Sequence, residues 1–316
     1  MGISVRSAPK AATQVTRVLD RMPAPALALG GVASLQCGAA VATRLFPAVG
    51  VAGVVALRLT FGAVVLCAWW RPRLHGDRRT WGLTLVVGSL LAAHHLSYYQ
   101  AIDRIPLGVA TTIEFLGPLA IALAGARHRR HVAWALLAAL GVIAVARPGG
   151  HLDWPGVLYA GAAGACWAGY ITVSATLTRR VGDSRNLAPA MVWGALICLP
   201  YGIIQAGPAL LRPRNLLLGL VVSLLSSVLS YSLQMDALRR MPRRLFSILA
   251  SLEPAIGALI GLVALGQQFT APQGIGIAAV VCASIGAAYT AKSPHAKASA
   301  GQQAAPGSSD EIGRPP

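Results

Sequence analysis

Residues 101–125 read A-I-D-R-I-P-L-G-V-A-T-T-I-E-F-L-G-P-L-A-I-A-L-A-G, and residues 237–261 read A-L-R-R-M-P-R-R-L-F-S-I-L-A-S-L-E-P-A-I-G-A-L-I-G. Aligned without a gap, the two stretches are identical at eight of their 25 positions. Each begins near one proline, carries a second proline mid-way (Pro118 or Pro254) and places a glutamate (Glu114 or Glu253) in an otherwise apolar run. The sequence therefore predicts two copies of one proline-bearing helix.

The chain is much poorer in charge than a soluble protein. Of its 316 residues, 55% are hydrophobic and 12% are charged, whereas roughly a quarter of the residues of a soluble domain are charged. Apolar runs of about 18 residues or more recur along the whole sequence, which is the length that a bilayer span requires. The composition predicts an integral membrane protein.

Ten apolar spans are expected, and they divide into five and five. They cover approximately residues 24–43, 50–70, 81–101, 107–125, 132–146, 155–177, 188–206, 215–238, 245–265 and 273–291. The expected fold is all-α, with a first five-helix repeat at 23–148 and a second at 149–291. Because each repeat has an odd number of spans, the copies must cross the bilayer in opposite directions. Inverted repeats with a site between them are typical of secondary transporters.

The net charge of +17 follows the expected topology. If the N-terminus is cytoplasmic, 21 of the 27 Lys and Arg residues fall on inner segments, as the positive-inside rule requires. The charge distribution predicts a multi-pass protein of the cell (cytoplasmic) membrane with both termini inside, in contact with lipid and without a nucleic-acid partner. The first span is long enough to be retained rather than cleaved. Residues 1–22 and 292–316 are expected to be cytoplasmic tails, the second of them disordered.

Five cysteines lie within apolar spans, at positions 37, 67, 166, 198 and 282, with no CxxC spacing. They are expected to be small buried side chains rather than disulfides or metal ligands. No nucleotide-binding loop, HExxH motif or Ser/His/Asp set occurs in the sequence. We therefore expect no cofactor, no metal and no enzymatic activity.

Glu114 and Glu253 are the first candidates for function. A charge at the bilayer centre costs about 2.5–3.5 kcal/mol on insertion scales, so each carboxylate needs a partner or water. Burial would let such a group exchange protons near neutral pH, as in a proton antiporter, or hold a substrate ammonium. A purely structural hydrogen bond between helices is the alternative. Aligned on the shared prolines, the two glutamates lie three residues apart, and we expect this offset to divide substrate binding from coupling.

Arg58 falls within the second span. A guanidinium keeps its proton, so Arg58 needs a carboxylate, backbone carbonyls or an anionic substrate. It is expected to hold the carboxylate of an amino acid, to brace one glutamate or to reach the interface.

Two histidines and two tyrosines lie towards the outer end of the third span (His94, His95, Tyr98 and Tyr99). A histidine near its usual pKa could relay protons, although an interhelical hydrogen bond is an equal alternative. Adjacent residues are about 100° apart on a helix, so at most one of the two histidines faces a cavity squarely.

Several stretches carry a resemblance to a known family. They are R-L-F-P-A-V-G-V-A-G-V-V-A-L-R-L (44–59), I-P-L-G-V-A-T-T-I-E-F-L-G-P-L-A (105–120), G-A-C-W-A-G-Y (164–170), S-Y-S-L-Q-M-D-A-L (230–238) and S-L-E-P-A (251–255). The chain resembles the EamA family of the drug/metabolite transporter superfamily, most closely the bacterial exporters of threonine and homoserine. It differs from that group at Gln234 and Gln267, where the group usually has glutamate, and in its third span.

The resemblance implies that spans 1, 3, 4, 6, 8 and 9 line a substrate cavity. By that analogy, polar or aromatic side chains on these spans are candidates for substrate contact, with helix packing as the alternative for each: Gln36, Trp167, Tyr170, Tyr231 and Gln234. Pro118 and Pro254 lie mid-span, where a proline permits a kink that could act as a gate. Asp236 near the end of the eighth span is expected to form a solvated ion pair with Arg239 or Arg240.

The expected function is secondary-active export of small amino acids such as threonine or homoserine, or of related metabolites, by proton antiport with alternating access. The alternatives are export of other metabolites or drugs, and a membrane protein that binds a ligand without transporting it. The expected partners are a small-molecule substrate, protons and the lipid bilayer. A homodimer remains open.

Overall fold

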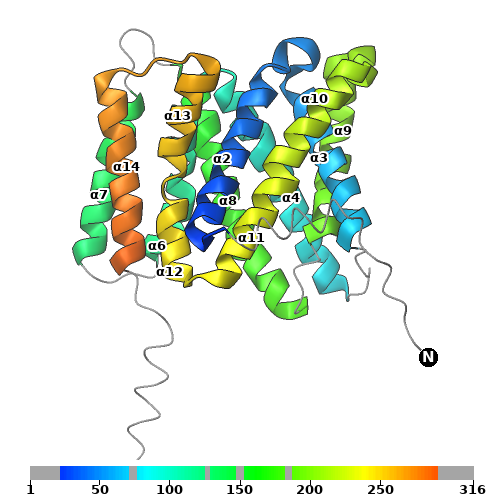
Figure 1. The fold of residues 1–316 in the computed structure, drawn as a ribbon. Helices are drawn as coiled ribbons and strands as arrows, with labels where there is room; N and C mark the ends of the chain where they lie inside the picture. The colour runs from blue at the N-terminus through cyan, green and yellow to red at the C-terminus, as the bar shows by residue number, and fades with distance from the viewer. Residues whose placement is uncertain (1–21, 71–76, 125–128, 147–152, 182–186, 291–316) are drawn as a thin grey trace, which may run out of the picture.

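The computed structural model describes residues 22–70, 77–124, 129–146, 153–181 and 187–290. All regular elements in these ranges are helical, and they stand side by side as a bundle (Figure 1). We call the face at the top of Figure 1, where α2 ends and α3 begins, the upper face, and the opposite one the lower face. The expected tails lie outside the described residues, apart from Met22. The elements are α2 (Ala24–Thr43), α3 (Phe46–Trp70), α4 (Arg78–Ile102), α5 (Leu107–Glu114), α6 (Leu116–Ala124), α7 (Arg129–Ala146), α8 (Trp154–Val181), α9 (Leu187–Ala206), a 3-10 helix η2 (Gly207–Leu211), α10 (Pro213–Ser223), a π-helix η3 (Leu224–Leu229), α11 (Ser230–Arg240), α12 (Arg243–Ala250), α13 (Glu253–Leu265) and α14 (Ala271–Thr290).

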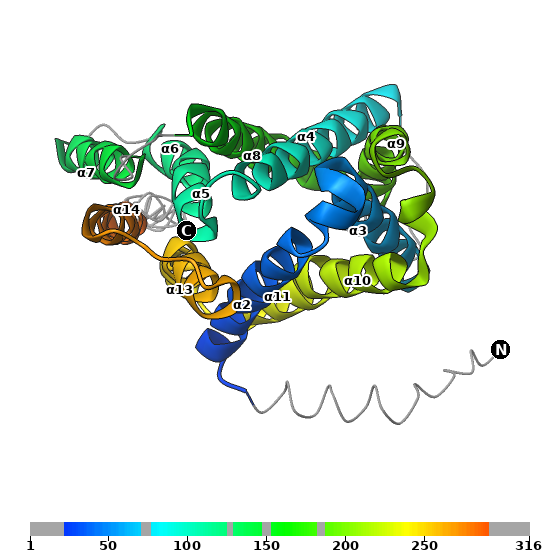
Figure 2. The ribbon, with the colours of Figure 1, turned by 90° about the horizontal axis from the view of Figure 1, so that it is seen from above.

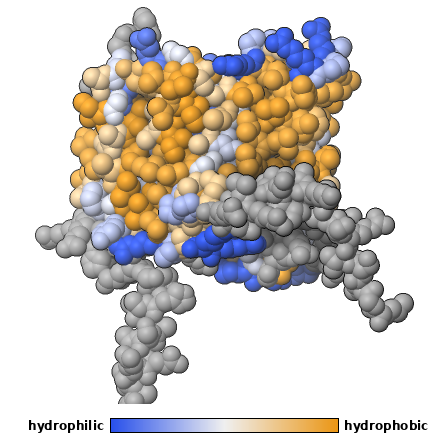
Figure 3. Space-filling view, in the orientation of Figure 1, coloured by the Kyte–Doolittle hydropathy of each residue, from blue (hydrophilic) through white to orange (hydrophobic). Residues whose placement is uncertain are grey.

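Helices occupy all ten positions expected from the apolar runs. Among the described residues, eight helical stretches are long and apolar enough to cross a bilayer. The other two are α4, which has 25 residues but is more polar, and α7, whose apolar part Val132–Val145 is shorter. Figure 3 shows a band of hydrophobic residues between polar residues at the upper and lower edges. The band has the character that the hydrocarbon core of a membrane requires.

The second span begins at Phe46, four residues earlier than expected, and it is interrupted at Gly50. Gly50 has φ 69° and ψ 171°, a conformation that glycine adopts readily and other residues avoid. The helix starts again beyond it, and the side-chain Oε1 of Gln205 accepts a hydrogen bond of 2.7 Å from the backbone N–H of Ala52. This cap satisfies a donor that the interruption would leave without a partner.

The two repeated stretches share their backbone as well as their sequence. Each begins after an extended proline, Pro106 (φ −55°, ψ 143°) or Pro242 (φ −57°, ψ 136°). The first helical segment of each then ends, at Phe115 in one copy and at Ser251 in the other, where φ is −65° in both. The breaks lie 136 residues apart, as do the prolines. Both copies therefore break at the same point.

The glutamates lie on opposite sides of these breaks. Glu114 is the last residue of α5, whereas Glu253 is the first residue of α13. Pro118 has no N–H to donate to the carbonyl of Glu114, four residues before it. The backbone of α8 approaches this carbonyl closely, because a Cβ placed on Gly164 would lie 2.6 Å from it.

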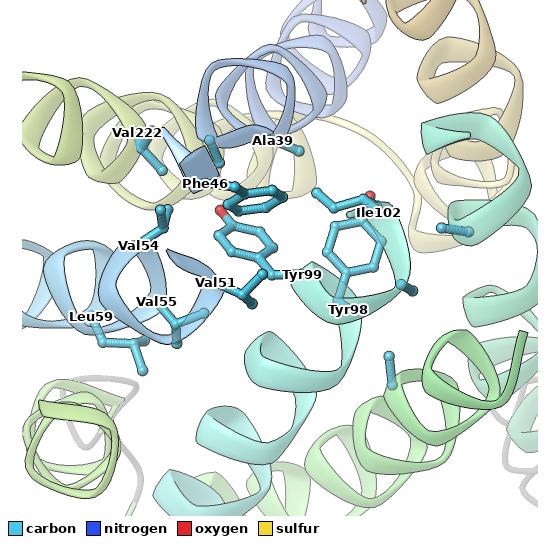
Figure 4. Packing of buried hydrophobic residues seen from close by; sticks show 14 of the residues in the cluster. Ala39, Phe46, Val51, Val54, Val55, Leu59, Tyr98, Tyr99, Ile102 and Val222 are labelled. Carbon is cyan, nitrogen blue, oxygen red and sulfur yellow. The ribbon is translucent and has the colours of Figure 1, made fainter. Parts of the chain in front are cut away.

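Most helix packing joins the first half of the chain to the second. The main pairs are α3 with α9, α4 with α8, α7 with α14, α2 with α11, α4 with α9 and α5 with α13, and these neighbours can be followed from above in Figure 2. The largest group of buried hydrophobic residues lies among these helices. Figure 4 shows its centre, where Phe46 and Tyr99 pack with ring centroids 5.7 Å apart.

Ion pairs at the lower face join or cap the ends of helices. Asp77 caps α4, because its Oδ1 accepts from the N–H of Thr80, and Arg180 of α8 lies 2.5 Å from its Oδ2. The hydrogen bonds from Thr80 and Arg180 hold the pKa of Asp77 below its usual range. The stabilisation is therefore present at neutral pH and is lost as the pH falls through the lowered pKa. Asp236 pairs with Arg240, as expected, at 2.5 Å.

The expectation that all five cysteines are buried is wrong at two positions. Cys198 is buried, but Cys37 and Cys282 are exposed on the surface of the protein. The physical reason is that a residue in an apolar span has no need to be buried inside the protein, because lipid tails are as apolar as a protein core.

We predict that Gly164→Ala destabilises the protein. The added methyl would meet the carbonyl of Glu114 at 2.6 Å, so α8 and the helix break must move apart, at a cost of about 1–3 kcal/mol. Thermal unfolding of the detergent-purified protein measures this effect. The control is Gly161→Ala on the same helix, where a Cβ meets nothing within 4 Å. Equal melting temperatures for the two variants would contradict the close packing.

A second prediction concerns Gln267, whose Oε1 accepts a hydrogen bond of 3.0 Å from the N–H of Leu107 at the start of α5. Gln267→Ala removes this cap and should lower the free energy of unfolding by about 1 kcal/mol. Chemical unfolding followed by tryptophan fluorescence tests it. The neighbouring exposed Gln268 supplies the control, Gln268→Ala, which should be close to neutral. A larger effect at Gln268 would show that the cap is unimportant.

Candidate functional site

The central contact of the site joins His94 of α4 to Glu114 at the end of α5. The Nε2 atom of His94 lies 2.5 Å from Oε1 of Glu114. Only 17% of the His94 side chain and 5% of the Glu114 side chain are exposed. The structure thus gives one of the two buried glutamates a hydrogen-bonding, ionisable partner from another helix.

Aromatic rings surround this pair. The ring of Tyr98 is stacked on His94 at a centroid distance of 6.2 Å, and Trp167 of α8 lies 5.8 Å from His94. Phe115, at the helix break, meets Trp167 edge-on at 5.9 Å. These rings remove water from around the pair, and in such an environment electrostatic interactions are stronger than in water.

The adjacent histidine has a different environment. His95 is buried, and its Nδ1 lies 2.7 Å from the carbonyl oxygen of Leu91. A carbonyl only accepts, so Nδ1 of His95 carries a proton and donates it. Nδ1 of His94, 3.4 Å from that donor, therefore faces it as an acceptor. His94 then has its proton on Nε2, which donates to the carboxylate of Glu114.

A chain of hydrogen bonds continues from Tyr98 to α2. Thr111 donates its hydroxyl proton to the carbonyl of Leu107 at 2.8 Å, so its oxygen accepts from Tyr98 at 2.9 Å and from the Nε2 of Gln36 at 3.0 Å. The Gln36 amide also lies against α13, because a Cβ placed on Gly257 would be 2.4 Å from its Nε2. Gln36 therefore lies between the two repeated helices.

Glu253 is buried but has no hydrogen bond or ion pair to another side chain in the described part of the chain. It lies one helical turn before Gly257, on the stretch of α13 that Gln36 contacts. Glu114 acts on it electrostatically, and Glu253 in turn acts on Tyr98 and on Tyr231 of α11. The two glutamates thus share one electrostatic environment, and within the described ranges Glu114 has a side-chain partner whereas Glu253 has none.

Arg58 forms a hydrogen bond with a tyrosine and no ion pair with a carboxylate among the described residues. Its NH1 donates to the hydroxyl of Tyr99 at 2.9 Å, while its buried Nε has no partner within the described ranges. Only 4% of Arg58 is exposed, which excludes the interfacial position considered from the sequence.

The remaining candidates lie around this cluster without a direct bond to it. Tyr170 is partly buried against the side of α4, and Tyr231 lies within range of the charges of both Arg58 and Glu253. Gln234 donates to the hydroxyl of Ser230 on its own helix at 2.9 Å and packs on Gly31 of α2. Contacts therefore bring together His94, Tyr98, Trp167, Glu114 and Gln36, and leave Gln234 outside.

Sequence reasoning missed two residues of the cluster, Thr111 and Phe115. Both lie in the first repeated stretch next to Glu114: Thr111 is three residues before it and Phe115 directly follows it. Their proximity to an intramembrane acid was the available signal. No group of three or more His, Cys, Asp or Glu that could hold a metal occurs among the residues searched, which are the described ones.

Known proteins resemble this chain over most of its length. The sequence profile of the EamA-like transporter family matches residues 154–289. The threonine/homoserine exporter RhtA of Escherichia coli (strain K12) is 39% identical over 268 residues, which cover 84% of this chain and 90% of the exporter. The chain belongs to the EamA-like transporter family.

Other relatives of this EamA-like transporter extend the comparison. RhtA of Salmonella typhimurium (strain LT2) is 39% identical over 263 residues, 82% of this chain and 89% of the relative. The uncharacterized transporter YwfM of Bacillus subtilis (strain 168) is 25% identical over 234 residues, 71% and 79% of the two chains. A solved crystal structure at 22% identity superposes with a TM-score of 0.60, over 83% of this chain and 96% of the other, and shares the fold.

Family membership identifies the protein as a membrane transporter and not an enzyme. The exporters among its relatives support a metabolite exporter, with a small-molecule substrate and a multi-pass position in the inner membrane.

We predict that Tyr99→Phe destabilises this EamA-like transporter. The buried guanidinium of Arg58 would lose the hydroxyl that accepts from NH1. Losing a hydrogen bond to a charged group costs about 1.5–3 kcal/mol. Thermal unfolding in detergent is the measurement, with Tyr201→Phe as the control because Tyr201 is 60% exposed. If the two variants unfold at the same temperature, the bond between Arg58 and Tyr99 contributes nothing.

Proposed function

We propose that this chain exports threonine, homoserine or similar small amino acids across the cytoplasmic membrane in exchange for protons. The observation that carries the proposal is the buried His94–Glu114 pair, 2.5 Å apart and enclosed by aromatic rings. An imidazole and a carboxylate at this distance can take up and release a proton inside the protein. The exporters at 39% identity support the class of substrate.

Alternating access between two inverted halves is the proposed mechanism. Numbering the spans from one to ten, the main contacts pair 1 with 8, 2 with 7, 3 with 6, 4 with 9 and 5 with 10, and also 3 with 7 and 2 with 8. Exchanging the halves, so that span 1 becomes 6 and span 2 becomes 7, leaves this set of pairs unchanged. That symmetry and the matching helix breaks support an inverted repeat, in which rocking of the halves exposes the site to each side in turn. In this proposal the breaks before Pro118 and Pro254 act as gates.

The proposed orientation places both termini in the cytoplasm. Among the described residues, eight arginines lie at the lower ends of α4, α8, α11 and α12 (Arg78, Arg79, Arg179, Arg180, Arg239, Arg240, Arg243 and Arg244), against four at the upper face (Arg44, Arg104, Arg212 and Arg214). An excess of arginine on one side is what the positive-inside rule associates with the cytoplasm.

The test uses purified protein in proteoliposomes with a panel of radiolabelled amino acids. We expect threonine or homoserine transport that follows an imposed proton gradient. Glu114→Gln should reduce gradient-driven transport by at least about tenfold, because a loss of 1.4 kcal/mol in coupling corresponds to a factor of ten. The matched control is Asp236→Asn, which removes an acid from an ion pair at the lower face, outside the site. Gradient-driven transport by Glu114→Gln at the wild-type rate would contradict proton exchange, and substrate binding without transport would indicate a ligand-binding protein.

A further inference from the structure

Glu114 and Glu253 are both buried, but their surroundings differ. Glu114 accepts a hydrogen bond from His94 at 2.5 Å, whereas Glu253 has no side-chain partner among the described residues. An ammonium group that approached Glu114 would have to displace the imidazole. At Glu253 it would find a carboxylate whose hydrogen-bonding capacity is unused.

We propose that Glu253 receives the ammonium group of the substrate and that the His94–Glu114 pair carries the exchanged proton. The assignment rests on the proposed function, export of an amino acid against protons, and names the task of each acid within it.

The position of Glu253 suits a cation. A buried carboxylate without a partner is costly in a membrane protein, and a primary ammonium offers it both a compensating charge and hydrogen bonds. Glu253 is the first residue of the 13-residue helix α13, where the helix dipole favours negative charge. The Gln36 amide of α2 lies against Gly257, one turn after Glu253 along α13, and Tyr231 lies within reach of the Glu253 charge. These neutral polar groups could orient a substrate bound at Glu253.

The His94–Glu114 pair suits a proton. In the structure His94 donates from Nε2 to the carboxylate, so the pair has one negative charge, and Nδ1 of His94, which faces the N–H of His95, carries no proton of its own. Uptake of one proton at Nδ1 gives an imidazolium beside a carboxylate, and the hydrogen bond from Nε2 is kept. It also places two N–H donors, those of His94 and His95, 3.4 Å apart. Two donors cannot bond to each other, so one of the two rings must then turn.

Charged and titratable groups from several helices face these two sites. They are His95, Tyr98 and Tyr99 from α4, Arg58 from α3, Glu114 from α5, Tyr231 from α11 and Glu253 from α13. The charge of Arg58 acts on His95 and Tyr231, and Glu253 acts on Tyr98 and Tyr231. Because Tyr98 stacks on His94, the two sites lie in one electrostatic environment.

This coupling produces exchange. An ammonium group at Glu253 and an added proton on His94 are two positive charges in one buried environment, so each disfavours the other. When an ammonium group binds Glu253, the proton therefore leaves Nδ1 of His94 for the bulk water. When the substrate leaves, a proton returns to the same nitrogen. Binding of each ligand weakens binding of the other by the same factor, which is the linkage that an antiporter needs.

The experiment separates binding from coupling in proteoliposomes that contain the full chain. Counterflow of radiolabelled L-threonine at equal pH on both sides requires the substrate site, and threonine transport driven by a pH gradient requires the proton site as well. Release of protons on threonine addition, followed with a pH-sensitive dye in detergent, reports their competition directly. The variants are Glu253→Gln, Glu114→Gln and His94→Asn, with Asp236→Asn as the control acid.

We expect Glu253→Gln to lose counterflow by at least about tenfold, the cost of one charged hydrogen bond. Glu114→Gln and His94→Asn should keep counterflow within about threefold of wild type, a change that corresponds to roughly 0.7 kcal/mol. Both variants should lose gradient-driven transport and proton release. Glu253→Asp keeps the carboxylate and should recover part of the counterflow. This recovery distinguishes a lost binding group from a misfolded protein.

Two kinds of failure are distinguishable. If wild-type protein moves neither threonine nor homoserine, the proposed function is wrong and the assignment of tasks is overturned with it. If wild-type protein transports and Glu253→Gln keeps its counterflow, or Glu114→Gln loses it, the assignment alone is overturned. The same holds if His94→Asn retains proton release.

Discussion

A carboxylate inside a membrane protein needs a partner, and this constraint organises the centre of the molecule. Glu114 obtains its partner from α4, because His94 reaches it across the helix interface at 2.5 Å. The contact requires α4, α5 and α8 to come together around the break that follows Glu114. Gly117 and Gly164 allow that approach, since a Cβ on either would lie within 2.6 Å of backbone on the other side. The pair and the glycines thus depend on each other.

Hydrophobic runs were sufficient to predict the ten helices, because a bilayer span leaves a strong signal in composition. The similarity of residues 101–125 to residues 237–261 was equally visible in the sequence, and both of these stretches contain a helix break. The exact breaks were harder to place. They lie three residues before Pro118 and Pro254, because a proline disturbs the turn that precedes it, through its missing N–H and its clash with the carbonyl four residues earlier. The interruption at Gly50 was missed, since its cap, Gln205, comes from a segment 153 residues away.

The candidate site shows a similar limit. The sequence identified Glu114, His94 and Arg58 as polar groups in need of partners, but it left several pairings open. Arg58 pairs with Tyr99 and not with a glutamate, and the histidine takes the carboxylate. Which polar group meets which depends on how α3, α4 and α5 are rotated against one another. That rotation is decided by the packing of many apolar side chains, such as those around Phe46 and Tyr99, and local sequence carries little information about it.

The two repeated stretches have similar backbones and different chemistry. The position 136 residues after His94 is Ser230, whose hydroxyl accepts from Gln234 of its own helix. The same shift takes Glu114 to Ala250, and Glu253 back to Gly117. Neither half therefore repeats the imidazole–carboxylate pair of the other. A duplicated helix with the same break supplies equivalent places for a polar group on both sides of the protein. Substitution at these places then decides what each can bind. Glu114 has a basic partner and Glu253 has none among the described residues, so the two acids are suited to different ligands.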